Sequence, residues 1–444
     1  MKIVIAGGGD IGFYLAKLLE QEYKNIVLID SQKENLKSVE TNLGIATILG
    51  DSTSYKTLKD AGVDSCNYFI GFTSSESVNI LSCILAKKLG AKHTVARISN
   101  MEYILNKDTL NFKINGIDDI ISPEFLAARE IEQILKEPSL TESIEIEDGK
   151  LKVIGLHLDE NSGIVGKSLA ESAKFNTDNS FMIAAIHRSG KTIIPNGKTI
   201  FETGDYLYFI TTDKTARQIL EFTGNPLIEI KNILIVGGSR TGEYIAHRLN
   251  KNFKITLIEK DQTKCNDLAL RIENIQVVHG DCTNTKLLEE ERIGNYNAFV
   301  SVTGNSETNI LSCMVAKHHN VTKTIALIEN IGLIDYSQNL GIDTLLNKKL
   351  AAANFLFKKI IRGNKLSFLY GVDAEIMEFT LHNDSGLINK PIKELNFPKK
   401  AIISGVIRNG EGYVTLGDFE FKANDKVFVF SDSQSSNKVV SFFE

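Results

Sequence analysis

Short apolar runs alternate along the first part of the chain with segments in which apolar residues recur every three or four positions. The segments between the runs have helical spacing, as Ile11, Leu15 and Leu19 illustrate. Strands that alternate in this way with amphipathic helices are typical of a parallel, doubly wound sheet. We therefore predict an α/β fold whose first strands lie in the runs at residues 2–6, 25–30, 46–51, 68–73 and 94–99.

The whole pattern recurs about 230 residues later. The glycine-rich turn at residues 7–12 returns at residues 237–242, again between an apolar run and a helical segment. The pentapeptide Asn-Ile-Leu-Ser-Cys is identical at residues 79–83 and 309–313. A repeat of this length indicates that the architecture is duplicated.

Each copy is followed by about seventy residues with a different pattern. After the first copy, strand-like runs lie at 151–158, 181–187 and 206–211, and we expect a short helix between residues 166 and 173. The acidic segment 138–149 has few apolar residues and indicates a linker. We predict two tandem modules with doubly wound parallel sheets, each followed by a small α+β companion domain, with bounds at 1–137, 148–215, 230–365 and 370–438.

The first glycine turn has the spacing of a dinucleotide-binding site. Gly7 allows a tight exit from the strand, Gly9 leaves room for a pyrophosphate, and Gly12 lets the helix pack closely on the sheet. The helix N-terminus then faces the phosphates. Asp30 ends the next strand, where it would accept hydrogen bonds from ribose hydroxyls and favour NAD over NADP. The alternative is that Asp30 only caps a turn.

Residues at the ends of the other strands are expected to face the same crevice, because ligands of open parallel sheets bind outside the carboxyl ends of the strands. Asp51 and Ser52 follow the third strand, Thr73 ends the fourth and Arg97 lies in the fifth. Asp51 is either a ligand contact or the N-cap of a helix that begins at residue 52 or 53. An arginine in an apolar strand needs an anion, which is either a phosphate or an internal or intersubunit carboxylate.

The second copy keeps the frame of this site but changes two of its residues. Ser239 stands where the first copy has Gly9, and Leu327 stands where it has Arg97. The serine narrows the approach of a pyrophosphate without closing it, so nucleotide binding and a degenerate scaffold are both open for this copy. Its candidate binding residues are Gly237, Ser239, Arg240, Thr241, Gly242, Glu259 and Asp281.

Composition narrows the possible functions. The 444 residues carry a net charge of −5 with basic and acidic residues interspersed, so we expect no nucleic-acid partner. No run approaches eighteen apolar residues and the chain starts with a strand, which predicts a soluble, unexported protein. The five cysteines lack CxxC spacing, which indicates neither a zinc site nor a redox pair. We predict no metal site and no catalytic residue.

The glycine turn, the acidic end of the second strand, the Gly-Asp pair after the third strand and the duplicated small domain resemble the peripheral NAD-binding subunits of Trk potassium uptake systems. The resemblance covers nearly the whole chain. It implies two Rossmann-type modules of the kind called regulators of potassium conductance (RCK), each with its companion domain. The nucleotide-binding residues that it implies in the first module are Gly7, Gly9, Asp10, Ile11, Gly12, Asp30, Asp51, Ser52, Thr73 and Arg97.

The resemblance also implies a cytoplasmic homotetramer on the inner face of the membrane, beneath a separate potassium-conducting Trk subunit. NAD or NADH, with ATP or ADP as further candidates, would favour different angles between modules, and the membrane subunit would respond without any enzymatic step. We expect the helix from Ser122 to Leu135 to carry this motion to a neighbouring chain. The alternatives are a regulator of another transporter or antiporter, and an NAD-dependent dehydrogenase, which the small companion domains disfavour.

Overall fold

The structure is a computed structural model, and it divides the chain into two compact units. Unit 1 consists of Met1–Leu135 and Ile230–Ile361, and unit 2 of Lys136–Glu229 and Arg362–Glu444. The structure describes residues 1–20, 22–140, 142–147, 149–160, 162–176, 178–189, 191–212, 215–224, 227–330, 340–360, 365–368, 374–432 and 434–443.

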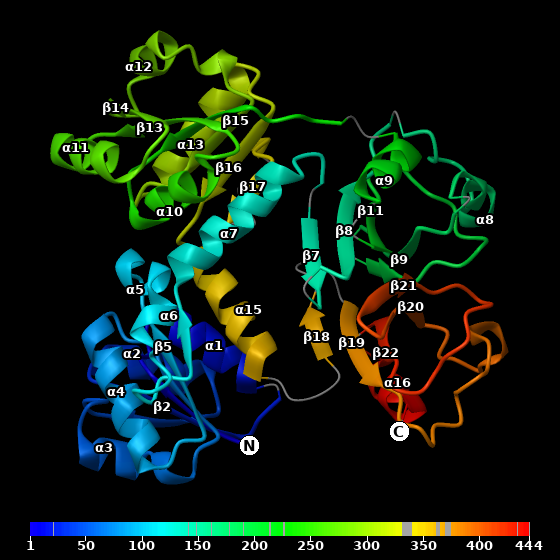
Figure 1. The fold of residues 1–444 in the computed structure, drawn as a ribbon, viewed down its shortest axis with the longest axis horizontal. Helices are drawn as coiled ribbons and strands as arrows, with labels where there is room; N and C mark the ends of the chain where they lie inside the picture. The colour runs from blue at the N-terminus through cyan, green and yellow to red at the C-terminus, as the bar shows by residue number, and fades with distance from the viewer. Residues whose placement is uncertain are drawn as a thin grey trace. The chain divides into compact units, whose positions relative to one another are not determined.

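The first module of unit 1 is built on a six-stranded sheet, drawn in blue to cyan in Figure 1. The strand order is β3-β2-β1-β4-β5-β6 and all neighbours are parallel, which is the order of doubly wound Rossmann folds. Its elements are β1 (Lys2–Ala6), α1 (Asp10–Glu20), β2 (Asn25–Asp30), α2 (Lys33–Asn42), β3 (Ala46–Leu49), α3 (Tyr55–Asp60), η1 (Val63–Ser65), β4 (Tyr68–Gly71), α4 (Glu76–Leu89), β5 (His93–Arg97), α5 (Met101–Leu105), α6 (Lys107–Leu110), β6 (Asp119–Ile121) and α7 (Pro123–Lys136).

The second module repeats this topology. Its parallel strands follow the order β14-β13-β12-β15-β16-β17, which confirms the predicted duplication of the sheet. Its elements are β12 (Asn232–Val236), α10 (Arg240–Leu249), β13 (Lys254–Glu259), α11 (Gln262–Arg271), β14 (Ile275–His279), α12 (Thr285–Glu290), η3 (Ile293–Asn295), β15 (Ala298–Ser301), α13 (Ser306–His318), β16 (Lys323–Leu327), β17 (Thr344–Leu346) and α15 (Lys348–Ile360).

Side-chain caps mark the first turns of α7 and α15 in unit 1. The hydroxyl of Ser122 accepts a hydrogen bond from the backbone N–H of Phe125 at the start of α7 (3.1 Å), as its sequence predicts. Asn347 caps α15 in the same way through its Oδ1 atom. Among the described residues, no helix is both long and apolar enough to cross a membrane.

The last helix of each module packs on the other module (Figure 1). The helix α15 lies along α1 and completes the core of the first module. The helix α7 lies along α10, where Phe125 packs edge-on against Tyr244 with ring centroids 5.7 Å apart and Arg248 pairs with Glu132. Within the chain α7 thus contacts the second module, and our expectation that it carries motion to a neighbouring chain stays a prediction. The side chains that α15 buries in the first core are Ala352, Ala353, Leu356, Phe357 and Ile360.

Unit 2 contains two five-stranded antiparallel sheets, one in each companion domain. The strand orders are β10-β9-β11-β8-β7 and β18-β19-β22-β20-β21. The second order is equivalent to the first when it is read in reverse, so that β18 corresponds to the edge strand β7. The first companion domain consists of β7 (Glu142–Ile146), β8 (Leu151–His157), α8 (Leu169–Ser172), η2 (Ala173–Phe175), β9 (Phe181–Arg188), β10 (Lys191–Ile193), β11 (Tyr206–Thr211) and α9 (Ala216–Thr223). The second consists of β18 (Lys365–Phe368), β19 (Ala374–Thr380), η5 (Ile392–Glu394), β20 (Ala401–Arg408), β21 (Glu411–Val414), β22 (Lys426–Asp432) and α16 (Ser436–Phe443).

The prediction of a linker at residues 138–149 is wrong for the central part of this segment. Residues 142–146 form β7, which pairs antiparallel with β8. An edge strand has a neighbour on one side only, so it tolerates charged residues that make it look like a linker. The expected bound at residue 370 lies outside the described residues.

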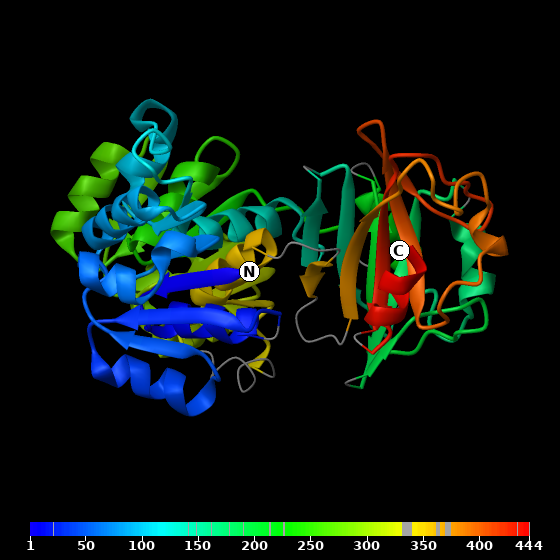
Figure 2. The same ribbon diagram turned by 90° about the horizontal axis from the view of Figure 1, so that it is seen from below.

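The two companion domains share a core. In Figure 2 the green and the orange-to-red strands of these domains lie next to each other. Buried side chains from both domains meet in one cluster, in which Tyr208 and Ile210 of β11 lie with Phe428 and Phe430 of β22. The opposite face of each sheet has an apolar cluster of its own, which includes residues of α9 in the first domain and of α16 in the second.

A buried arginine–aspartate pair is repeated in the two companion domains. In the second, Arg408 of β20 donates from Nε and Nη2 to the two carboxylate oxygens of the fully buried Asp425 at 2.8 and 2.7 Å. Arg188 and Asp205 form the same two bonds in the first domain. The two aspartates each follow directly after a turn. Their position before β11 and β22 makes them anchors for the turn and for the neighbouring strand.

We expect Asp425→Asn to destabilise the second companion domain by about 3 kcal/mol, because it leaves the Arg408 guanidinium without its charged partner. Hydrogen exchange of β20 and β22, followed by mass spectrometry, would measure the loss. Asp418→Asn is the matched control, because Asp418 is 85% exposed and pairs with Lys393 on the surface. Equal exchange in the two variants would show that the buried pair contributes nothing special.

Candidate nucleotide site

The turn between β1 and α1 contains glycines for two different reasons. Gly7 has φ of +115°, and a Cβ atom there would lie 2.6 Å from the carbonyl oxygen of Phe72. A Cβ atom on Gly12 would lie 1.9 Å from the carbonyl oxygen of Gly7, so the packing of α1 on the sheet demands glycine. A Cβ atom on Gly9 would have no protein atom within 4 Å apart from those of Gly9 itself and of its two neighbours in the chain. Packing therefore explains Gly7 and Gly12, and it leaves Gly9 free for a ligand to approach.

The start of α1 is uncapped by any side chain from the turn. The first helical hydrogen bond runs from the N–H of Phe13 to the carbonyl oxygen of Gly9 (2.9 Å), which makes Gly9 the N-cap residue. Glycine has no side chain that could accept from the N–H groups of Asp10, Ile11 or Gly12. These donors and the positive end of the helix dipole together form an arrangement that attracts anions.

Asp30 fixes the shape of this turn. Its Oδ2 atom accepts hydrogen bonds from the N–H of Gly8 (2.7 Å) and from the Asn35 amide (3.2 Å), and its Oδ1 atom accepts from the N–H of Gln32 (2.7 Å). The turn-capping role that we considered as an alternative is therefore present. A carboxylate has about four acceptor positions, so these three bonds still leave capacity for a ribose hydroxyl.

The structure corrects one of the two interpretations of Asp51. Its Oδ1 atom accepts from the N–H and the hydroxyl of Thr53, both at 2.8 Å. The helix α3 begins only at Tyr55, and its N-cap is Ser54, so the expectation that Asp51 caps a helix beginning at 52 or 53 is wrong. The ligand contact remains a prediction for this exposed carboxylate. Ser52, another predicted contact, is buried.

Asn79 is a residue of the site that the sequence analysis missed. Its Oδ1 atom accepts from the N–H and the hydroxyl of Thr73 at 2.8 and 2.7 Å. Its Nδ2 atom donates to the carbonyl oxygens of Thr73 (3.1 Å) and Arg97 (3.0 Å). The buried amide thus ties together the carboxyl ends of β4 and β5. Asn309 makes the equivalent four bonds in the second module, and the identical pentapeptides were the signal that could have revealed this role.

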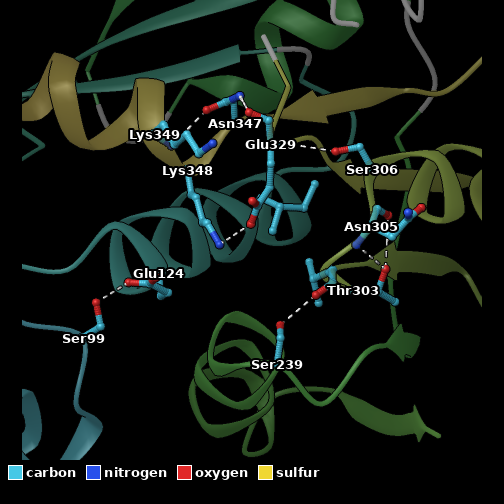
Figure 3. A network of polar contacts seen from close by, with 12 residues as sticks. Ser99, Glu124, Ser239, Thr303, Asn305, Ser306, Glu329, Asn347, Lys348 and Lys349 are labelled. Atoms are coloured by element: carbon cyan, nitrogen blue, oxygen red, sulfur yellow. Dashed lines mark hydrogen bonds and ion pairs between the residues drawn. The ribbon is translucent and has the colours of Figure 1, made fainter. Parts of the chain in front are cut away.

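Arg97 has an internal anionic partner. Its Nη2 atom lies 3.8 Å from Oε1 of Glu124, the second residue of α7. Glu124 is buried and accepts a hydrogen bond from the hydroxyl of Ser99 (2.7 Å; Figure 3). The salt bridge that we gave as an alternative is therefore present. The contact at 3.8 Å is loose and the guanidinium has five N–H donors, so a phosphate contact remains a prediction.

The second glycine turn has a similar backbone conformation to the first, but different side chains lie around it. Gly237 has φ of +102°, and a Cβ atom on Gly242 would lie 2.0 Å from the carbonyl oxygen of Gly237. Glu259 takes the place of Asp30: its Oε2 atom accepts from the N–H of Gly238 (2.6 Å). Hydrogen bonds from the N–H and hydroxyl of Thr283 lower the pKa of Asp281, which stands where the first module has Asp51.

Ser239 fills the position that Gly9 leaves open. Its hydroxyl donates to the carbonyl oxygen of Val302 (2.7 Å) and accepts from the N–H of Gly242 (3.4 Å), so it caps α10 (Figure 3). The Nη1 atom of Arg240, another predicted contact, lies 3.1 Å from Oε1 of Glu76 in the first module, and a ligand contact of Arg240 remains a prediction. Thr241 is buried. The second turn therefore already uses part of the surface that a pyrophosphate would need.

The TrkA-N domain family matches residues 3–123 and 233–348, and the TrkA-C domain family matches residues 153–224 and 376–444. The chain belongs to the TrkA family. These matches confirm the resemblance stated above and the order of a large module followed by a small one. The repeated glycine turns and parallel sheets lie in the TrkA-N regions, and the two antiparallel sheets lie mainly in the TrkA-C regions.

Relatives of TrkA type match over the full length. The Trk system potassium uptake protein TrkA homolog of Archaeoglobus fulgidus is 28% identical over 444 residues, with all of both chains covered. The Trk system potassium uptake protein TrkA of Haemophilus influenzae is 28% identical over 453 residues, with 100% of this chain and 99% of that one covered. These names describe potassium uptake rather than a catalysed reaction.

Solved structures with the same fold include the GsuK RCK domain, with a TM-score of 0.61 and 16% identity over 100% of this chain and 94% of that one. The GsuK channel bound to NAD has a TM-score of 0.62 and 16% identity, with 100% of this chain and 78% of that one covered. At this identity the likeness concerns the fold, and it confirms the predicted tandem Rossmann-type architecture.

We expect Gly12→Ala to destabilise unit 1 strongly and Gly9→Ala to change its stability by less than about 1 kcal/mol. The reason is that the new Cβ atom collides with Gly7 in the first variant and meets open space in the second. Thermal unfolding followed by circular dichroism would compare the two. A Gly9→Ala protein as unstable as Gly12→Ala would contradict the assignment of Gly9 to ligand access.

Proposed function

We propose that this TrkA-family chain is a nucleotide-binding regulatory subunit of a potassium transporter, and that nucleotides change transport by shifting its conformation. The observation that carries the proposal is the open space beside Gly9 at the uncapped start of α1, with the Asp30 carboxylate at the end of the adjacent strand. The full-length relatives named for potassium uptake support the part in potassium transport.

NAD or NADH is the first candidate ligand, and ADP or ATP the second. A dinucleotide would place its pyrophosphate at the start of α1 and a ribose near Asp30. GsuK, which shares the fold, has been solved with NAD and with ADP. Of the residues that we proposed as contacts, Gly7 and Gly12 act by shaping the turn, whereas Gly9, Asp30, Asp51, Thr73 and Arg97 would lie beside the ligand.

The second module is the weaker of the two sites. Its Ser239 hydroxyl occupies the position beside the turn and already accepts from an N–H group of α10. A pyrophosphate would have to displace this hydroxyl, since both need the same donors. Glu259 remains available to a ribose through its unused acceptor positions.

The regulatory effect requires that a nucleotide bind two conformations of the chain with different affinity. A difference of about 1–3 kcal/mol changes an equilibrium between two states several-fold to a hundredfold. The chain would act from the cytoplasm as a homotetramer that docks on a Trk-type membrane subunit. The naming of the relatives as parts of a Trk system supports only the link to a Trk-type membrane subunit, and the homotetramer is part of the proposal.

Reciprocal exchange of one residue between the modules tests nucleotide binding. We expect wild type to bind NADH and ADP at one site per chain, and Gly9→Ser to weaken this binding at least about tenfold because the hydroxyl takes an N–H donor from the phosphates. Ser239→Gly should keep the first site and strengthen the second. Isothermal titration of the full chain measures affinity and stoichiometry. Absence of binding by wild type, or consumption of NADH, would overturn the proposal.

Rubidium uptake by proteoliposomes tests the regulatory step. With a Trk-type membrane subunit in the bilayer, we expect the added chain to change the uptake rate several-fold and the nucleotide to modulate this change. Gly9→Ser should still bind the membrane subunit but lose the response to nucleotide. An uptake rate that is the same with and without the chain would argue against regulation of this transporter class.

A further inference from the structure

Lys349 of the second module ends at the glycine turn of the first. Its Nζ atom lies 2.5 Å from Oδ2 of Asp10, which is the first residue of α1. The Lys349 side chain is only 19% exposed, whereas that of Asp10 is 72% exposed. The largely buried Lys349 side chain therefore places its ammonium group at the start of α1, where the phosphates of a nucleotide would lie.

The position of Lys349 is held from both ends of α15. At the start, Oδ1 of Asn347 accepts from the N–H of Lys349 (2.9 Å), and the Asn347 amide donates to the carbonyl oxygen of Glu329 (3.3 Å; Figure 3). At the other end, Lys359 pairs with Asp119 of the first module. Between these ends the apolar face of α15 is buried against the first module. The ammonium group is thus preorganised at the turn.

The electrostatics of this position favour an anion with more charge than a carboxylate. An ammonium group beside the positive end of a helix is unfavourable unless an anion lies between them. Asp10 supplies one negative charge, but an ion pair with so exposed a partner is weak. Lysine is a common partner of phosphate groups, to which it offers a compact charge and three donors.

At the positions equivalent to Asp10 and Lys349, the second glycine turn and the helix α7 have residues of opposite charge. The first residue of α10 is Arg240, and the second residue of α7 is Glu124, where α15 has Lys349. The Glu124 carboxylate, which pairs with Arg97 and Ser99, offers no positive charge to a phosphate at the second turn. This reversal distinguishes the two modules more sharply than Ser239 does, because it changes the sign of a charge.

We propose that Lys349 is a phosphate-binding residue of the nucleotide site of the first module, although it belongs to the second. On binding of a nucleoside diphosphate, triphosphate or dinucleotide, its ammonium group exchanges the Asp10 carboxylate for phosphate oxygens. This inference rests on the proposed nucleotide binding. Because the same residue is part of α15, occupation of the site strengthens the contact between the two modules.

A series of adenine ligands tests the role of Lys349. The full chain is titrated calorimetrically with adenosine, AMP, ADP and ATP, which differ only in their phosphates. Wild type should bind more tightly as phosphates are added. Lys349→Met should weaken ADP and ATP at least about tenfold and leave adenosine unchanged. Lys348→Met is the matched control, because the neighbouring Lys348 pairs with Glu329 of its own module.

Asp10→Asn separates phosphate binding from a purely structural ion pair. If the ion pair were purely structural, Asp10→Asn and Lys349→Met would change ADP affinity in the same direction. The proposal instead predicts tighter ADP binding in Asp10→Asn and weaker ADP binding in Lys349→Met. In the double variant the effect of Asp10→Asn should shrink, because the two residues are coupled. If Lys349→Met folds poorly, Lys349→Arg serves as a second test. It keeps the positive charge, so it should retain ADP binding.

The outcomes distinguish failure of the inference from failure of the proposed function. If wild type binds none of the ligands, the proposed function is wrong and this inference falls with it. If wild type binds ADP and Lys349→Met binds it equally well, the nucleotide site stands and the role of Lys349 is wrong. Equal weakening of adenosine and ADP in Lys349→Met would also refute it, since the loss would then be structural.

Discussion

The burial of α15 against α1 is the contact on which the arrangement of unit 1 depends. The two small residues Ala352 and Ala353 allow a close approach of the helices, and Leu356 and Phe357 fill the space beside them. Full burial of one large apolar side chain contributes about 1.5–3 kcal/mol, more than an exposed ion pair. Because α15 comes from the second module, the core of the first is complete only when both are folded. The two modules therefore form one compact unit with a shared core.

The reciprocal contact between α7 and α10 uses other side chains. It has an ion pair between Arg248 and Glu132, and the Tyr244 hydroxyl donates to the carbonyl oxygen of Ser99 (3.0 Å). The two contacts were free to diverge because a duplicated chain does not need to be symmetric. The same divergence separates the two glycine turns. Packing retains glycine at the first and last positions of each turn, whereas the middle position, where no such demand exists, is Gly9 in one and Ser239 in the other.

Much of this fold and part of the site could be predicted from local pattern. The parallel strands of both modules and the cap at Ser122 follow from apolar spacing and cap chemistry. The strand β7 was missed because an edge strand can be acidic, and the short strand β10 has too few residues to show a period. The roles of Asn79 and of the buried arginine–aspartate pairs were missed because their partners lie on other strands, at a distance in sequence that no local pattern records.

The sequence by itself determined that there are two Rossmann-type modules with companion domains, and that their glycine turns differ, with Gly9 in the first and Ser239 in the second. These properties depend on residues within one element or one turn. Only the tertiary structure decided which module each terminal helix covers and that Lys349 meets Asp10, 339 positions away. The apolar face of α15 specifies that it must be buried but not against which of two similar sheets. That choice depends on the complementarity of surfaces that form only when both modules have folded.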